Sequence, residues 1–294
     1  MSRVVSAREA EWPRRLSELG PYPAPGRLFV EGSPLPVDDA LVVAVVGTRR
    51  PTSIGLRVAQ ELATDLCAAG VVVVSGLAVG IDAAAHRAAL DASGHTVAVL
   101  GCGLDVDYPH RNLRLKQRLA RSGTLVSEYP EGVQPARHHF PRRNRIIAGL
   151  SDGVVVVEGA ITSGALVTAR LALDCNREVF AVPGSVRNPM AQGPNELIRT
   201  SQAALVTSAA DILEELAPGV AAMPPPPTLN EPLALSFEEA ALLRALDDVP
   251  LSLEHICSSA QLEPGAAAAA LSRLELQALV ERTVAGYSRA APRR

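Results

Sequence analysis

The sequence predicts an α/β protein: an extended Rossmann-like, doubly wound and mostly parallel sheet, followed by a small C-terminal winged-helix-like domain. Between residues 41 and 216, short aliphatic runs alternate with longer amphipathic segments, which is the rhythm of repeated βαβ units. Several of these runs end in glycine or a small hydroxyl residue, as strands do at the ligand-binding edge of such a sheet. Beyond residue 216 this pattern stops at a proline-rich stretch and a shorter helix-like series begins.

Length and composition set the number of domains. The chain has 294 residues, of which 48% are hydrophobic, and a mean hydropathy of +0.16, which suffices for one large core and one small one. We expect four parts: a short irregular N-terminal arm at residues 1–36, a Rossmann-like domain at 37–217, a Pro-rich linker at 218–232 and a winged-helix-like domain at 233–294.

Seven uninterrupted aliphatic runs have the composition of buried parallel strands. They lie at residues 41–46, 71–74, 96–100, 124–127, 154–157, 179–182 and 203–206. The segments between them carry apolar residues at helical spacing. We expect helices near residues 54–69, 80–93, 110–122, 141–150, 163–174 and 208–216.

The two flanks differ from this central part. Five prolines between residues 21 and 36 argue against long regular elements in the N-terminal arm, and the four prolines at 224–227 predict a semi-rigid linker. The remaining segments predict a winged helix. Its helices are expected near residues 237–246, 253–260 and 264–276, and residues 279–288 form a hairpin that turns at Ala285-Gly286.

Charge and cysteine usage exclude several classes of protein. No apolar run reaches the roughly 18 to 20 residues of a membrane span, and no signal-peptide stretch follows Met1, so we expect a cytoplasmic protein without membrane contact. The four cysteines are scattered and no histidine stands at metal-ligand spacing, so neither disulfide, metal nor cofactor is indicated. Lys116 is the only lysine, which excludes a P-loop and argues against a Schiff-base mechanism.

The net charge of −3 is unevenly distributed. Residues 111–121 contain five cations and no acid, and we interpret them as the wet face of a helix. Residues 137–145 contain four more, again without an acid. The segment from residue 236 onward carries six cations and eight acids, and its expected recognition helix has Arg273 as its only cation, so contact with a protein is favoured there over a grip on DNA.

The segment 138–150 predicts an anion site. Pro141 suits the first turn of a helix, and Ile146, Ile147 and Leu150 then form a buried stripe. The cations Arg142, Arg143 and Arg145 therefore stand at the positive end of a helix, where a polyanion would neutralise them, and Phe140 offers a face for a stacked base. The alternative is that the arginines pair with acids elsewhere and Phe140 belongs to the core.

Small residues follow five of the expected strands and predict a phosphate-binding rim. These are Gly47-Thr48-Arg49, Ser75-Gly76, Gly101-Cys102-Gly103, Glu158-Gly159 with Ser163-Gly164, and Pro183-Gly184-Ser185. Glycine at such a turn also serves plain steric need, and Arg49 equally suits a salt bridge within the fold.

Several short motifs stand in order between residues 28 and 216. They are VVGTR at 45–49, SGLAVGID at 75–82 with Ala85-His86, AVLGCG at 98–103, Tyr108-Pro109, FPRRNRIIAGLS at 140–151, Ser163-Gly164 with Thr168-Ala169, and VPG at 182–184. This set resembles the motifs of the DNA-processing protein A family (DprA, also called Smf), and so many motifs in register are hard to produce by chance.

The resemblance implies a protein that binds single-stranded DNA, forms homodimers and loads the RecA recombinase onto incoming strands in natural transformation, without catalysis. Carried over by motif, Arg49 and the set Arg142, Arg143, Asn144 and Arg145 would contact phosphates, and Phe140 would stack on or pocket a base. Backbone or hydroxyl donors would come from Gly47, Ser75, Gly76, Ser163 and Gly164, and Thr48 falls in the same DNA-binding set. Ser75, Gly76 and Asp82 equally suit a structural role.

The alternative function is enzymatic. Rossmann-like proteins that cleave nucleoside monophosphates carry a Pro-Gly-Gly-x-Gly-Thr loop with a following glutamate. That loop is absent here, where residues 158–164 read EGAITSG. Glu158 remains as a possible catalytic carboxylate, but no partner acid or nucleophile stands at a readable spacing.

Overall fold

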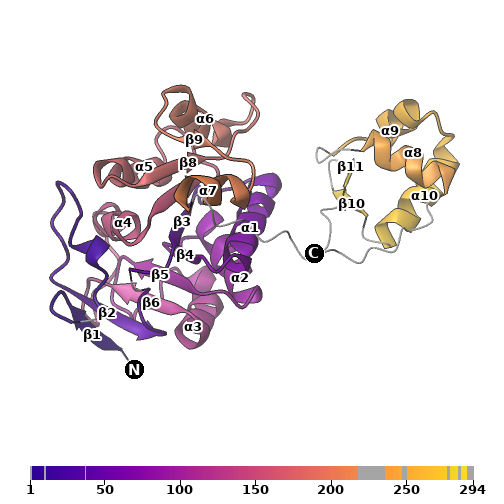
Figure 1. Ribbon diagram of the computed structural model, residues 1–294. Coiled ribbons are helices and arrows are strands. Elements are labelled where there is room, and N and C mark those ends of the chain that lie inside the picture. The colour runs from indigo at the N-terminus through magenta and orange to yellow at the C-terminus, as the bar shows by residue number, and fades with distance from the viewer. Residues whose placement is uncertain are drawn as a thin grey trace. The chain divides into compact units, whose positions relative to one another are not determined.

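The computed structural model describes residues 2–9, 11–36, 38–217, 236–246, 250–276, 279–283 and 286–289. The chain divides into two compact units, Met1–Met223 and Pro224–Arg294. The first unit holds a nine-stranded sheet between two layers of helices (Figure 1). The predicted linker at residues 218–232 lies outside the described residues.

Seven parallel strands form the centre and one edge of the sheet. They are β3 (Val42–Val46), β4 (Val72–Ser75), β5 (Thr96–Leu100), β6 (Thr124–Ser127), β7 (Gly153–Val156), β8 (Glu178–Ala181) and β9 (Ala204–Leu205), all within the expected runs to one or two residues. The full order is β1-β2-β6-β5-β4-β3-β7-β8-β9. After β6 the chain returns to the other side of β3 to form β7, so the direction of winding reverses beside β3, and such a reversal opens a crevice at the carboxyl ends of the strands.

The expectation of an irregular N-terminal arm is wrong. Residues of this segment form β1 (Arg3–Ser6) and β2 (Arg27–Gly32), and β2 pairs antiparallel with both β1 and β6, extending the sheet. The prolines are compatible with these strands because they stand between and after them, where no ladder hydrogen bond is needed. Between the two strands, a 3₁₀ turn at Arg14–Leu16 and the buried Leu19 pack on Gly149, where a Cβ would lie 2.1 Å from the Leu19 side chain.

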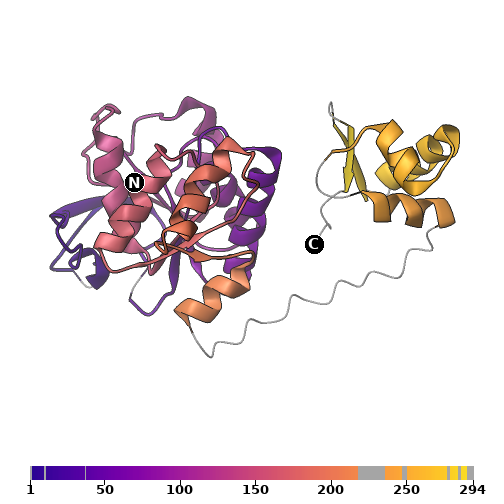
Figure 2. The same ribbon diagram turned by 90° about the horizontal axis from the view of Figure 1, so that it is seen from above.

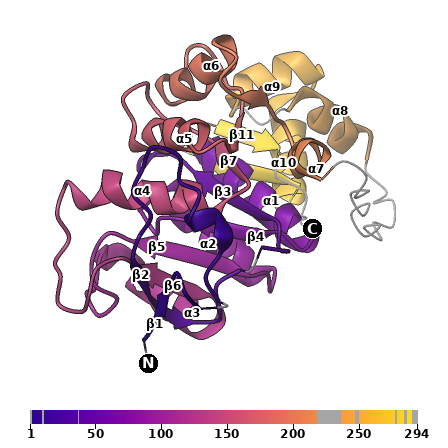
Figure 3. The ribbon, with the colours of Figure 1, turned by 60° about the vertical axis from the view of Figure 1, so that its left-hand side comes forward.

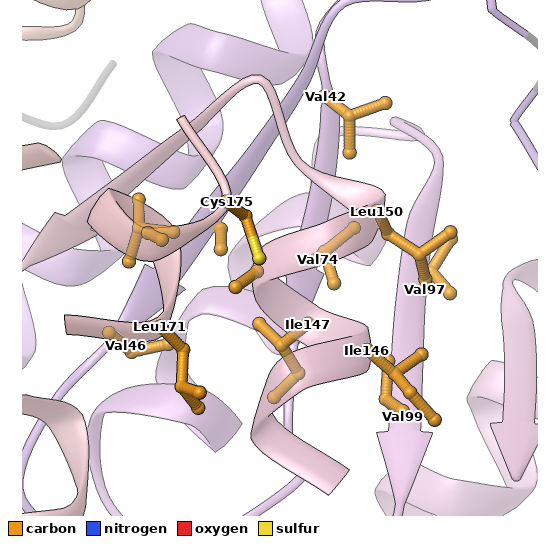
Figure 4. Packing of buried hydrophobic residues seen from close by; sticks show 14 of the residues in the cluster. Val42, Val46, Val74, Val97, Val99, Ile146, Ile147, Leu150, Leu171 and Cys175 are labelled. Carbon is orange, nitrogen blue, oxygen red and sulfur yellow. The ribbon is translucent and has the colours of Figure 1, made fainter. Parts of the chain in front are cut away.

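Helices cover both faces of the sheet because the strand side chains alternate between them. On one face, α1 (Ser53–Ala68), α2 (Ile81–Asp91) and α7 (Ala209–Leu216) pack on Val43 and Val45. On the same face, α3 (Leu113–Ser122) packs on Ala98 and Leu125. The other face receives α4 (His139–Leu150) and α5 (Gly164–Asp174) (Figure 3). Figure 4 shows Ile146, Ile147 and Leu150 of α4 against Val74, Val97 and Val99, which is the apolar stripe expected from the sequence.

One helix was not expected from the sequence. Helix α6 (Gln192–Arg199) contains Pro194 and four polar residues, and this composition leaves too few apolar residues for a recognisable helical stripe. Pro194 falls in the first turn, where its missing N–H leaves no hydrogen bond unmade. Short 3₁₀ turns at His110–Asn112 and Pro189–Ala191 precede α3 and α6.

The second unit has the order of a winged helix. Helices α8 (Phe237–Ala245), α9 (Leu253–Ala260) and α10 (Pro264–Leu276) precede an antiparallel hairpin of β10 (Val280–Thr283) and β11 (Gly286–Arg289), which lies beside them (Figure 2). Leu242, Ile256, Leu271 and Leu274 form its core. The cation of the expected recognition helix, Arg273, is paired with Glu239 of α8 at 2.8 Å. In the described part of the chain, no helix combines the length and apolar character that crossing a bilayer requires.

Candidate nucleic-acid interface

A groove of about 660 Å³ lies at the carboxyl edge of the sheet, where the winding reverses. Its walls are the loop after β3, the first turns of α4 and the first turns of α5. The groove brings together eight of the twelve residues expected to bind DNA, namely Gly47, Thr48, Arg49, Phe140, Arg143, Asn144, Ser163 and Gly164. Three segments that are far apart in the sequence therefore form a single surface.

Helical geometry explains which residues of α4 face the groove. Phe140, Arg143, Asn144 and Ile147 line it, and these positions recur at i, i+3, i+4 and i+7, the spacing of one helix face. Arg142 and Arg145 are absent from the lining, because their side chains leave the helix on a different face. Of the three arginines expected at one site, the structure therefore places only Arg143 in the groove lining.

Phe140 and Arg49 form the exposed part of the groove. The Arg49 guanidinium carbon lies 5.4 Å from the centroid of the Phe140 ring, and the ring of Tyr108 lies 5.6 Å from it on a tilted plane. Phe140 is half-buried and Arg49 is exposed. Arg49 forms no salt bridge with a carboxylate of the described residues, although the sequence suited one. Gly101 is needed below the ring, since a Cβ there would approach a Phe140 ring carbon to 3.0 Å.

Arg143 is a buried cation in the floor of the groove. Its guanidinium donates to the carbonyl oxygens of Gly76, at 2.8 Å, and Val99, and its Nε donates to Asn144 Oδ1 at 3.2 Å. Burial lowers the pKa of Arg143 to about 10, and the nearby charge of Asp82 opposes this shift. No described carboxylate stands within ion-pair distance of the guanidinium, so its charge is compensated only from farther away. The floor of the groove thus holds a buried charge that is only partly compensated, an arrangement that is costly.

Asp82, in the first turn of α2, is the nearest acid to Arg143. Its carboxylate accepts hydrogen bonds from the amides of Gly76 at 3.2 Å and Ala78 at 3.4 Å. Burial raises the pKa of this carboxyl group, against the effect of the Arg143 and Arg49 charges. Asp82 therefore fixes the loop after β4 and holds Arg143 in place by its charge.

Ser75 and Gly76 are not free to donate to a phosphate. The Ser75 hydroxyl is fully buried and donates to the Val45 carbonyl at 2.7 Å, which ties β4 to β3. The Gly76 amide is used by Asp82, and a Cβ on Gly76 would lie 2.5 Å from the Arg143 guanidinium. Ser75 and Gly76 thus have the structural role that was the alternative to DNA binding. Gly47 is likewise set by packing, since a Cβ there would lie 2.5 Å from the Ile81 side chain.

Arg145 and Arg142 share one acid outside the groove, Glu128. Arg145 is buried and donates to Glu128 at 2.7 Å and to the Pro23 carbonyl at 3.1 Å. Arg142 is exposed, and its Nε lies 3.4 Å from the second oxygen of the same carboxylate. Pairing with an acid elsewhere, the alternative interpretation of these cations, thus applies to both.

The other wall of the groove is the start of α5. Ser163 is its N-terminal flanking residue, and its hydroxyl makes no hydrogen bond to the helix. Gly164 is exposed, and nothing in the structure lies within 4 Å of the position of a Cβ there. Open backbone amides at the start of a helix favour an anion.

Arg137 and Arg50 also line the groove, and the sequence analysis did not assign them to the site. Arg137 stands three positions before Phe140, and its place in the acid-free run was the available signal. The other cationic run, at residues 111–121, behaves as expected. Its arginines are exposed, three of them on α3 and Arg111 in the turn before it, and Lys116 alone among its cations is buried, donating to the Val106 carbonyl at 2.6 Å.

Glu158, the carboxylate considered for catalysis, is committed to holding the fold. It is buried and accepts hydrogen bonds from the Thr52 amide at 2.9 Å, the Thr52 hydroxyl at 2.7 Å and the Asn188 amide group at 3.2 Å. It thereby anchors the start of α1 beside β7. Within the described ranges no group of three histidine, cysteine or acidic side chains is arranged to hold a metal ion.

Comparison with known proteins identifies the family. Residues 3–217 match the model of DNA recombination-mediator protein A, and residues 221–286 match the DprA winged helix domain. The chain belongs to the DNA recombination-mediator protein A family. It is similar to DNA processing protein DprA of Bacillus subtilis, with 46% identity over 195 residues that make up 66% of this chain and 65% of the relative. The chain thus spans just under two thirds of that relative.

Two solved structures of family members resemble the chain. The structure of DNA processing protein A from Streptococcus pneumoniae has a TM-score of 0.68 and 43% identity, covering 73% of this chain and 74% of that one. DNA processing protein A from Helicobacter pylori has a TM-score of 0.65 and 30% identity, covering 74% of this chain and 95% of that one. The H. pylori structure is reported for its single-stranded DNA binding mode.

Proposed function

We propose that this member of the DNA recombination-mediator protein A family binds single-stranded DNA in the groove between α4 and α5, without sequence preference and without catalysis or cofactor. The observation that carries the proposal is the placement of the exposed Arg49–Phe140 pair over the buried Arg143, whose charge has no direct ion-pair partner among the described residues. A polyanion with accessible base faces offers phosphates to the two arginines and a base to the Phe140 ring.

Each part of a nucleotide strand has a counterpart in the groove. Arg49 and Arg137 are exposed at its rim and suit phosphates, and the open start of α5 at Ser163 and Gly164 suits a further one. Phe140 suits a base. Its ring already lies against Arg49 and Tyr108, so a base enters beside them as a third stacked group. A base in a duplex reaches such a ring only by leaving the stack, and this cost favours single strands.

We further propose that the protein acts as a homodimer in the cytoplasm and passes the bound strand to the RecA recombinase during natural transformation. Membership in a family described as recombination mediators supports this assignment. The winged-helix unit, whose expected recognition helix offers one cation already paired to Glu239, is proposed to contact protein instead of DNA.

The test is fluorescence anisotropy with a labelled oligo-dT, a mixed-sequence single strand and a duplex of the same length, each titrated at several salt concentrations. We expect similar affinities for the two single strands and a weaker affinity for the duplex. Equal or tighter binding of the duplex would contradict the proposal. Incubation with nucleoside monophosphates, followed by analysis of the products, tests the absence of catalysis.

A further inference from the structure

Glu128 stands next to the groove and is shared by two arginines that differ in how firmly they are held. It follows β6 directly, and its side chain is 15% exposed. One carboxylate oxygen accepts a hydrogen bond from Arg145 at 2.7 Å. The other is buried, lies 3.4 Å from Arg142 Nε, and has no hydrogen-bond partner.

Arg145 is fixed. Its side chain is 5% exposed, and besides Glu128 it donates to the carbonyl oxygens of Pro23 at 3.1 Å and Arg142 at 3.3 Å. Arg145 therefore joins the N-terminal segment to α4 and is not available to a ligand.

Arg142 is held loosely. Its side chain is 59% exposed, and its guanidinium makes no hydrogen bond to any described residue. The ionic contact with Glu128 is therefore its only polar contact with the described residues. An exposed ion pair of this kind contributes little and is readily exchanged.

The position of Arg142 matters because it lies in the first turn of α4, two residues after Phe140. That turn contains no acid, and its flanking residue His138 provides no side-chain cap, so the positive end of the helix dipole is open there. A phosphate of a strand that continues past Phe140 along this turn would compete with Glu128 for Arg142.

We propose that Glu128 restrains Arg142 outside the groove in the free protein and that a phosphate of the bound strand replaces it. Glu128 then sets the strength of single-strand binding by its competition with the phosphodiester, while its Oε1 atom keeps Arg145 in place. This inference rests on the proposed binding of single-stranded DNA.

The test is a double-mutant cycle with Glu128→Gln, Arg142→Ala and the double variant, each titrated with labelled oligo-dT. Glutamine still offers an oxygen to Arg145 but carries no charge. We expect Glu128→Gln to tighten binding by about two- to fivefold, the range of an exposed ion pair, and to steepen the salt dependence. In the Arg142→Ala background the same change is expected to have no effect.

Asp91→Asn is the matched control. It removes one negative charge from an exposed ion pair, Asp91–Arg118, at the far end of α2 and α3. Equal tightening by Asp91→Asn and Glu128→Gln would reduce the effect to net charge, and equal tightening with and without Arg142 would reduce it to repulsion between Glu128 and DNA. Either result overturns the proposal, as does no tightening at all. Failure of the wild-type protein to bind would instead overturn the proposed function.

A second measurement covers the case in which Glu128→Gln does not fold, as judged by a thermal melt. The side-chain Nε resonance of Arg142, assigned by its loss in Arg142→Lys, is followed by NMR as oligo-dT is added to the wild-type protein. We expect this resonance to shift while that of Arg145 stays in place. A stationary Arg142 resonance under saturating DNA would overturn the proposal.

Discussion

The guanidinium of Arg49 lies over the ring of Phe140, with Cζ 5.4 Å from the ring centroid. The two residues are 91 positions apart in the sequence. They meet because β3 ends, and α4 begins, at the carboxyl edge of the sheet. An exposed cation in contact with an aromatic face offers a nucleotide strand, at one point, a partner for a phosphate and a partner for a base.

Arg49→Ala is expected to weaken single-strand binding and to lower the slope of log affinity against log salt by roughly one phosphate contact. The slope identifies a lost charge contact, whereas a lost stacking contact leaves it unchanged. Anisotropy titrations over a range of salt concentrations measure it. Arg118→Ala, which removes an exposed cation of α3, is the control and should leave affinity nearly unchanged. An Arg49 variant with the wild-type slope would remove Arg49 from the site.

Phe140→Ala is expected to cost about 1 to 3 kcal/mol of binding free energy while preserving the salt slope, because base–aromatic stacking is lost and no charge changes. Phe140→Tyr keeps the ring and should retain most of the affinity. Because Phe140 is half-buried, a thermal melt accompanies both titrations. Unfolding of Phe140→Ala would assign the ring to the core, the alternative role.

Arg145→Ala is expected to lower stability by about 2 kcal/mol, because it leaves the Glu128 carboxylate without its charged hydrogen bond. Chemical denaturation measures this loss. At temperatures where the variant is folded, its salt slope for DNA should equal that of the wild type. A reduced slope in a fully folded variant would show that Arg145 reaches a phosphate after all.

His86 makes stability depend on pH. Its ring is fully buried, its Nδ1 lies 2.7 Å from the Thr96 hydroxyl, and burial lowers its pKa from 6.5 to about 3. Between these values the unfolded chain takes up a proton that the folded chain does not. The free energy of unfolding therefore falls as the pH falls through this window, by up to about 1.4 kcal/mol per pH unit from this group.

The check is denaturant unfolding of wild type and His86→Asn at a series of pH values below neutral. Asparagine does not titrate and can still bond to Thr96, so the variant should lose stability less steeply as the pH falls. Parallel curves for the two proteins would contradict the assigned role.

Truncation after Met223 is expected to preserve most single-strand binding, since residues up to Met223 form a compact unit that contains the whole groove. The loss should appear in association with a protein partner, measured by pull-down with RecA. A large drop in DNA affinity on truncation would instead assign a DNA contact to the winged-helix unit, whose Arg282 and Arg289 lie on the hairpin.

The parallel strands β3 to β7 were predictable because each is buried on both faces and reads as a short, mostly aliphatic run. Residues 96–100 and 124–127 were expected as strands and observed with the same bounds. The winged helix was predictable because its helices are short and separated by turn residues. The two short strands of the N-terminal segment were not predictable. Prolines flank them, and β6, with which the inner strand β2 pairs, lies nearly 100 residues away.

The sequence by itself determined the α/β fold, the family and the run of cations at the start of α4. Only the tertiary structure decided which of those cations can meet a ligand. A run of letters records Arg142, Arg143 and Arg145 as equivalent, but the helix points Arg143 to one side and Arg142 and Arg145, which both reach Glu128, to another. Arg143 turns into the groove floor, Arg145 is buried against Glu128 and Pro23, and Arg142 stays at the surface. The acid that divides them, Glu128, is itself supplied by the end of another strand, β6, which no spacing within α4 reveals.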